Sequence, residues 1–144
     1  MITFRGPVTF HMNGEDVQLI PVPVAHTDGD TMVRFPGVDV IMTGDFYRSV
    51  GYPNIDRANG GSLKGMLEGF TALINLAGPG TKIIPGHGAV VDKGGVAALV
   101  SQGKTQEQVV AAKPTSEYDA RVPQAAQTSD RFVGQLYAEI KGGR

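Results

Sequence analysis

The sequence of 144 residues contains no cysteine. Disulfide bonds, thiolate metal ligands and a cysteine nucleophile are therefore excluded, and any metal ion would have to be bound by histidine and carboxylate side chains. The chain also has almost no net charge, −1 at pH 7, and its 13 Lys and Arg residues are scattered along the sequence. We therefore expect neither a nucleic acid nor an anionic membrane as a partner.

No apolar run approaches the length that spans a bilayer, and the N-terminal residues lack the charged and apolar segments of a secretory signal. These absences predict a soluble, cytoplasmic protein. A chain of 144 residues corresponds to one domain with a substantial hydrophobic core. We expect residues 1–91 to form a β-meander, a helix and a strand that carry the site, and residues 92–144 to add a helical extension to the same domain.

Alternating and apolar runs predict four strands in the first third of the chain. Asn13-Gly14 separates the first two, and this dipeptide favours the turn of a tight hairpin. A helix should begin after Ser62, which can cap a run with apolar residues at every third or fourth position, and Gly78-Pro79 should end it. A crossover connection should then lead into a fifth strand. The five expected strands cover residues 8–12, 16–24, 31–35, 38–43 and 82–85.

The stretch between the fourth strand and the helix, residues 46–61, mixes aromatic residues with Gly, Pro, Asn and Asp. This composition predicts a long ordered loop that forms a wall beside the site. Its candidates for contact with a substrate are Tyr47, Arg48, Tyr52 and Asn54, and a solvent-facing loop would explain these residues equally well.

The last third of the chain predicts helices that pack on the sheet. The expected segments are a short helix at residues 96–102, a helix at 105–112, an extended stretch at 113–127 and a helix that begins at Thr128 or Ser129. Five apolar residues share one face of this last helix, namely Phe132, Val133, Leu136, Tyr137 and Ile140. Such a stripe is typical of a helix that docks on a core, and we assign it no catalytic role.

Three residues suited to a divalent cation each follow an apolar run that ends in a Gly-rich or acidic turn. They are His26 in A-H-T-D-G-D, Asp45 in I-M-T-G-D and His87 in I-I-P-G-H-G. Imidazole and carboxylate are ligands that zinc accepts, and strand ends present them from an ordered platform. We therefore predict that the three converge on a metal site. Asp28 and Asp30 should hold the turn around His26 without binding the ion.

The order of these strings resembles the second half of the metallo-β-lactamase fold hydrolases. The resemblance covers most of residues 3–91 and includes G-Y-P-N-I-D and G-G-S before the helix. It implies an α/β fold that is half of an αββα sandwich, with a mixed β-sheet and helices packed on one face. It also implies one or two ions, usually zinc, with His26 as a ligand of the first, Asp45 as the bridge and His87 as a ligand of the second.

The family's other ligands come from an upstream H-x-H-x-D-H motif, and this sequence contains no such string. His11 is the only other histidine, and we expect it to be solvated beside the hairpin turn. We therefore expect an incomplete site in a chain that is either a fragment, an engineered piece or a naturally reduced member. Half a sandwich leaves one sheet face uncovered, so we expect a homodimer or a complementing N-terminal half.

Two hypotheses for the function remain. In the first, the chain is a zinc-dependent hydrolase, or the C-terminal part of one, whose metal-bound hydroxide attacks a small-molecule ester, thioester, lactone, amide or phosphoester. Asp45 is then the catalytic residue, because it sets the spacing of the ions. In the second, the chain is a non-catalytic, truncated module that self-associates or complements an N-terminal half. Neither the substrate nor the choice among zinc, iron and manganese follows from the sequence.

Overall fold

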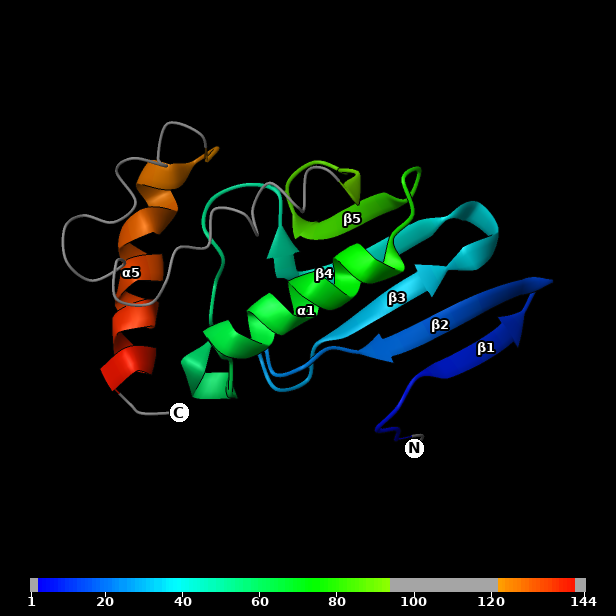
Figure 1. Ribbon diagram of the computed structural model, residues 1–144, viewed down its shortest axis with the longest axis horizontal. Helices are drawn as coiled ribbons and strands as arrows, with labels where there is room; N and C mark the ends of the chain where they lie inside the picture. Colours follow the sequence, from blue (N-terminus) through cyan, green and yellow to red (C-terminus); the bar gives the residue numbers. More distant parts are fainter. Residues whose placement is uncertain (1–2, 94–121, 142–144) are drawn as a thin grey trace.

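The computed structural model describes residues 3–93 and 122–141, and these build a five-stranded sheet with helices (Figure 1). The strand order is β1-β2-β3-β4-β5, so neighbours in the sheet are also neighbours in the sequence. The first four strands are antiparallel, whereas β5 runs parallel to β4. The strands are β1 Val8–Met12, β2 Glu15–Pro21, β3 Thr31–Phe35, β4 Val40–Arg48 and β5 Lys82–His87. The predicted mixed α/β sheet is therefore confirmed.

The hairpin between β1 and β2 turns at the predicted dipeptide. Asn13 and Gly14 both have positive φ angles, 55° and 77°, as the favoured two-residue hairpin turn requires. Met12 and Glu15 pair directly across it. The strand β2 ends at Pro21 rather than at residue 24, because the next residues leave the sheet to form the turn that contains His26.

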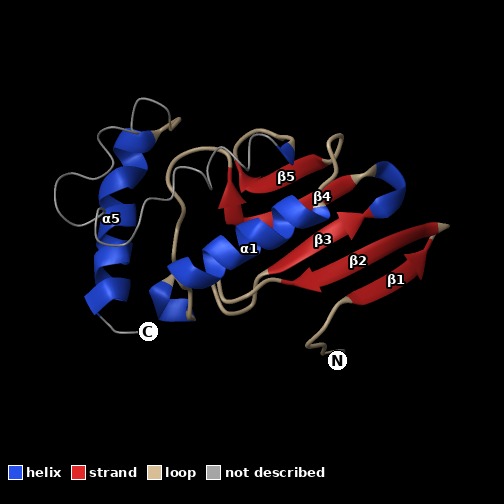
Figure 2. Cartoon of the chain, in the orientation of Figure 1, coloured by secondary structure: helices blue, strands red, loops and turns tan. Residues whose placement is uncertain are grey.

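Helix α1, Leu63–Leu76, lies across one face of the sheet (Figure 2). Its first turn is capped as expected, since the Ser62 hydroxyl accepts a hydrogen bond from the Gly65 amide at 3.0 Å. A side chain at Gly65 would collide with the carbonyl of Val24, and one at Gly69 would lie 2.8 Å from Val22. These two glycines therefore let the helix approach the backbone closely at the strand end that leads to His26.

The core lies between α1 and the sheet. Its fully buried side chains include Phe46 and Tyr47, each 1% exposed. Tyr47 packs edge-on against Phe70 at 6.1 Å between ring centroids. Burial, and secondarily the charge of Asp92, raises the pKa of Tyr47 to about 12. The prediction of a loop from residue 46 is wrong here, because β4 continues to Arg48 and buries both aromatic side chains.

Three further elements complete the described chain. They are the 3₁₀ helices η1 Pro36–Val38 and η2 Arg57–Asn59, and the helix α5 Ala125–Lys141 at one end of the sheet. Helix α5 begins before the predicted Thr128, so residues 125–127 are helical rather than extended. Leu136 is buried and Phe132 packs against the core, which confirms the docking face for these two residues.

The helices expected at 96–102 and 105–112 lie outside the described residues. No helix in the described ranges is long and apolar enough to cross a membrane.

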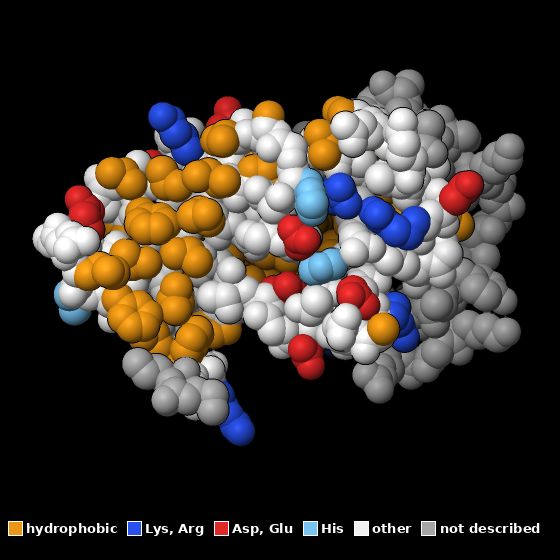
Figure 3. Space-filling view, turned by 180° about the vertical axis from the view of Figure 1, so that it is seen from behind, with side chains coloured by type: hydrophobic (Ala, Val, Ile, Leu, Met, Phe, Trp, Pro, Cys, Tyr) orange, Lys and Arg blue, Asp and Glu red, His pale blue; other side chains and the backbone are white. Residues whose placement is uncertain are grey.

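The two faces of the sheet differ in polarity. Where α1 does not cover it, the α1 side carries polar pairs such as His11 with Asp16 and Gln18 with Arg34. The opposite face is apolar across the antiparallel strands, and Figure 3 shows this patch from behind. Side chains alternate between the faces, which places there, with Glu15, Pro21 and Thr31 at the strand ends, nine apolar residues of the antiparallel strands: Val8, Phe10, Met12, Val17, Leu19, Val33, Phe35, Val40 and Met42. We call these nine residues the open apolar face.

Candidate metal centre

Three predicted ligand side chains lie together at the edge of the sheet. The Nε2 atom of His26 is 3.9 Å from Oδ2 of Asp45, and the Nε2 atom of His87 is 3.5 Å from the same oxygen. Figure 3 shows two histidine side chains on this surface with an acidic side chain between them. His26 is mostly buried, whereas the side chains of Asp45 and His87 are about half exposed. The sequence separates these residues widely, and the fold brings them to one point.

A distortion of strand β4 directs Asp45 towards this point. The register between β4 and β5 shifts on both sides of Gly44, which has a φ angle of +60°. Such an irregularity turns a side chain out of its regular position in the strand. The Asp45 carboxylate then packs against Gly86 of β5, where any Cβ atom would overlap Oδ1 of Asp45. The segments Thr43–Asp45 and Pro85–His87 therefore pack closely against each other, because Gly44 and Gly86 have no side chains.

His26 is fixed by a backbone hydrogen bond on the far side of its ring. Its Nδ1 atom lies 2.8 Å from the carbonyl oxygen of Asn54. A carbonyl only accepts hydrogen bonds, so Nδ1 carries the proton, and in the neutral ring the Nε2 lone pair faces Asp45. Histidine ligands of metals are commonly oriented in this way. This arrangement favours a cation between Nε2 and the carboxylate, because two acceptors facing each other repel.

The chemistry of these donors suits zinc, but their number is small. Two ligands of a tetrahedral zinc ion with bonds of about 2.0–2.1 Å lie roughly 3.3 Å apart, close to the His87–Asp45 spacing. Among residues 3–93 and 122–141, however, no three His, Cys, Asp or Glu side chains are arranged to hold one ion. The described geometry is that of two His–Asp pairs that share Asp45.

The two aspartates near His26 stabilise its loop. The carboxylate of Asp30 accepts hydrogen bonds from the amide and the hydroxyl of Thr27, at 3.0 Å and 3.1 Å. Asp28 is exposed and its backbone amide donates to Asn59. His11 lies in the β1–β2 hairpin, 2.6 Å from Asp16, with 78% of its side chain exposed, as the sequence predicted.

Three of the residues expected to contact a substrate have partners within the structure. Tyr47 belongs to the core, and Tyr52 is 8% exposed and stacks on Phe132 at 5.1 Å between ring centroids. Asn54 accepts hydrogen bonds from His26 through its carbonyl and from Gln135 through its side chain. Both tyrosine rings therefore point into apolar packing.

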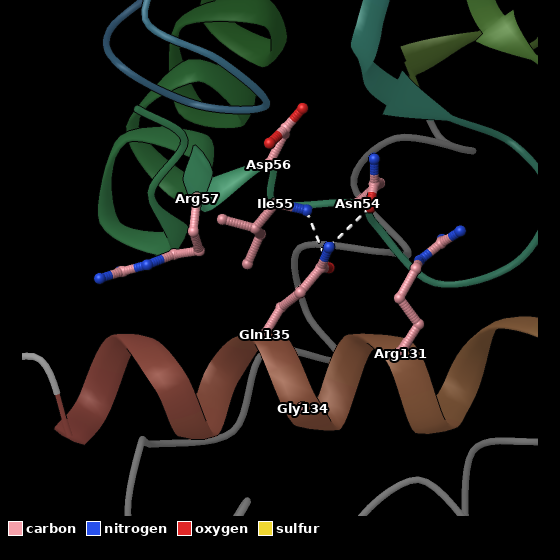
Figure 4. A pocket seen from close by; sticks show the side chains of 7 residues that line it. All are labelled: Asn54, Ile55, Asp56, Arg57, Arg131, Gly134 and Gln135. Atoms are coloured by element: carbon pink, nitrogen blue, oxygen red, sulfur yellow. Dashed lines mark hydrogen bonds between the residues drawn. The ribbon is translucent and has the colours of Figure 1, made fainter. Parts of the chain in front are cut away.

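Helix α5 has a role that its sequence did not reveal. Gln135 donates to Oδ1 of Asn54 at 2.7 Å and accepts from the amide of Ile55 at 2.9 Å (Figure 4). The Asn54 carbonyl orients the imidazole of His26. Gln135 therefore stabilises the loop that holds this imidazole in place. An open cleft of about 530 Å³ lies between the helix and the loop. An isolated glutamine on an amphipathic helix carries no signal of such a role.

Comparisons with known proteins identify the fold. Neither a family model nor a curated protein sequence matches this chain. Among solved structures it is similar to a metallo-beta-lactamase from Pontibacter korlensis, with TM-score 0.60 and 19% identity over 69% of this chain and 46% of that one.

Two further structures extend this similarity. ETHE1 from Myxococcus xanthus matches 94% of this chain and 51% of its own, at 16% identity and TM-score 0.57. The archaeal metallo-beta-lactamase superfamily protein ST1585 from Sulfolobus tokodaii matches 98% of this chain and 50% of its own, at 18% identity and TM-score 0.55. The chain spans about half the length of these proteins, and over that half it has the metallo-β-lactamase fold.

Proposed function

We propose that this chain supplies part of the metal centre of a hydrolase with the metallo-β-lactamase fold. The observation that carries the proposal is the convergence of His26 and His87 on one oxygen of Asp45. The reaction would be hydrolysis of an ester, thioester, lactone, amide or phosphoester. The similarity to solved metallo-β-lactamase superfamily structures supports this class of reaction through the shared fold.

Zinc is the ion that we propose for this centre. When bound, it would act as a Lewis acid and lower the pKa of a coordinated water from 15.7 to about 7. The protein's contribution is to orient the ligands. The Asn54 carbonyl holds the His26 tautomer with Nε2 towards Asp45, and the packing of Asp45 against Gly86 fixes the carboxylate between the two imidazoles. The carboxylate of Asp45 could therefore interact with a cation next to His26 or with one next to His87.

The small number of ligands has a consequence for affinity. Catalytic zinc commonly has three protein ligands and an open position, whereas each His–Asp pair here offers two residues. We therefore propose that this chain binds zinc weakly by itself. Firm binding would need ligands from another part of the complete protein.

A zinc titration of chelator-treated protein by isothermal titration calorimetry tests the proposal. His26→Ala, Asp45→Ala and His87→Ala should each weaken binding at least tenfold, the lower end of the range for ligand-supporting residues. His11→Ala is the matched control, because it removes an exposed histidine far along the sheet and should leave the affinity unchanged. Equal loss in the control, or unchanged binding in all three variants, would contradict the metal centre. Zinc-dependent turnover in an esterase and lactonase screen, lost in Asp45→Ala, tests the activity.

The open apolar face supports a second function, association with another copy of this chain. Phe10, Met12 and Met42 are 38%, 55% and 42% exposed, and an exposed apolar patch of this kind commonly marks an interface. Its nine residues are apolar and Glu15 lies only at the hairpin end, so two copies can bury the apolar part against each other, as a two-fold interface requires. We propose that two copies bury these faces against each other in place of the layer that completes the fold in longer proteins.

Sedimentation velocity at micromolar concentration tests this association. The unmodified chain should sediment as a dimer, and Phe10→Glu should produce monomers, because a buried carboxylate without a partner is strongly unfavourable. Leu67→Glu is the control, since Leu67 is equally exposed but lies on helix α1, away from the face. A strictly monomeric unmodified chain would overturn the proposal.

A further inference from the structure

An arginine stands directly beside the candidate metal centre. Arg48 ends strand β4, three residues after Asp45, and is the register partner of His87 in β5. Its Nε atom donates to the carbonyl of Val50 at 2.8 Å, and the neighbouring Ser49 amide donates to the His87 carbonyl at 3.0 Å. The guanidinium is therefore anchored at the sheet edge where the three predicted ligands meet. Its two Nη groups take no part in this anchoring bond.

A second arginine reaches the same region from helix α5. Arg131 is exposed, and its Nη2 atom lies 3.4 Å from the carbonyl of Tyr52. The helix is held against this loop by a bond from the Tyr52 amide to the Thr128 hydroxyl at 2.9 Å. Gly51 has a φ angle of +66°, and a Cβ atom there would lie 2.7 Å from Thr128. This close approach places Arg131 beside the end of β4.

The charges of Arg131 and Asp45 both act on Arg48. Burial lowers the pKa of Arg48, the positive charge of Arg131 lowers it further, and Asp45 acts in the opposite direction. Arginine side chains carry a positive charge at neutral pH in proteins. In the part of the chain that the structure describes, no ion pair involves either arginine. Figure 3 shows basic side chains gathered next to the histidines on this surface.

We propose that Arg48 and Arg131 form an anion-binding subsite, which selects substrates with a carboxylate or phosphoryl group close to the bond that is hydrolysed. The inference rests on the proposed function for the position of that bond. Guanidinium groups bind such anions through paired N–H donors, and an anion stabilises two neighbouring positive charges. Arg48 would hold the anion on the His87 side, and Arg131 would close the subsite from α5.

Calorimetric titration of the chelator-treated protein with phenylphosphonate and with benzoate tests the subsite without any metal. We expect saturable binding of one molecule of at least one of these anions, and no binding of the neutral ester diethyl phenylphosphonate. Arg131→Gln should weaken the binding about tenfold, the loss typical of a charge-assisted contact. This variant alters an exposed residue and should fold normally. Arg48→Gln should have the same effect, and Arg48→Lys should restore part of it.

Arg34→Gln is the matched control, because it removes the same charge from the distant β3 strand, where Arg34 is bonded to Gln18. Unchanged anion affinity in this control supports a specific subsite. Equal weakening by all three glutamine variants, or the absence of saturable binding, would overturn it. Anion binding that persists while the zinc titration fails would leave the subsite standing and remove the proposed metal centre. The reverse result would remove the subsite alone.

Discussion

Gly86→Ala tests most directly whether the close packing of Gly86 against Gly44 and Asp45 positions the Asp45 carboxylate. The added methyl group would overlap Oδ1 of Asp45 and would lie 2.7 Å and 2.8 Å from the backbone carbon and oxygen of Gly44. The carboxylate can rotate away, but the Gly44 backbone is part of the pairing between β4 and β5 and cannot shift freely. The substitution should therefore move Asp45 and strain the sheet edge together.

The size of the effect follows from these overlaps. Overpacking a well-packed position destabilises a protein by about 1–3 kcal/mol. A loss of about 2 kcal/mol corresponds to a decrease of roughly 4–8 °C in Tm for a domain of about 150 residues. Displacement of the shared carboxylate should in addition weaken zinc binding by roughly 10–100-fold, the range for groups that position metal ligands.

Differential scanning calorimetry and the zinc titration measure the two effects separately. Gly80→Ala is the control, because a Cβ atom there meets only Asp39 at an ordinary distance of 3.7 Å. The control should keep its Tm and its zinc affinity within experimental error. A Gly86→Ala protein with unchanged Tm and unchanged zinc affinity would refute the argument that Gly86 sets the position of Asp45.

Three other substitutions or conditions give distinct outcomes. Gln135→Leu removes both contacts to the loop at Asn54, so His26 should lose its fixed orientation and zinc affinity should fall about threefold to tenfold by calorimetry. The folded pKa of Tyr47, about 12 against an ordinary 10.0, means that stability is intact below pH 10 and falls as the pH rises to 12, which urea unfolding at each pH would detect. Gly134→Ala meets nothing within 4 Å and should stabilise helix α5 by about 0.5–1 kcal/mol, measured by thermal unfolding.

Each of these three predictions has a control or a result that would contradict it. Unaltered zinc binding in Gln135→Leu would show that the Asn54 carbonyl holds His26 without help from α5. For the alkaline transition, Tyr47→Phe is the control and should remove the decrease in stability between pH 10 and 12. A lower Tm for Gly134→Ala would mean that the added methyl group disturbs the docking of α5.

The sequence predicted most of the sheet because the relevant interactions are local. The Asn13-Gly14 turn, the strand at Thr31–Phe35 and the Ser62 cap all depend on the conformational preferences of a few adjacent residues. The fourth strand was predicted too short because Gly44 and Asp45 resemble a strand end. In the folded chain the distorted strand continues past them, and parallel pairing with β5 stabilises its last residues.

In the candidate site, too, some features could be predicted from the sequence and others depend on tertiary packing. The identities of His26, Asp45 and His87, and their places beside glycines, are properties of the sequence and predicted that the three side chains lie near one another, although no three of the described side chains are arranged to hold one ion. The roles of Tyr47 and Tyr52 could not be predicted, because an aromatic side chain in a polar stretch is compatible with either a surface wall or a core. Packing against Phe70 and Phe132 decides that both rings are buried.

The sequence by itself determined which chemical groups are present: two imidazoles, a carboxylate and no thiol, in an order of motifs that predicted half of a metallo-β-lactamase fold. Only the tertiary structure decided which other groups stand beside them. Arg131 and Gln135 reach the site through docking of α5 on the loop, and pairing of β4 with β5 places Arg48 opposite His87. These contacts join residues up to 81 positions apart, and no local pattern encodes such a separation.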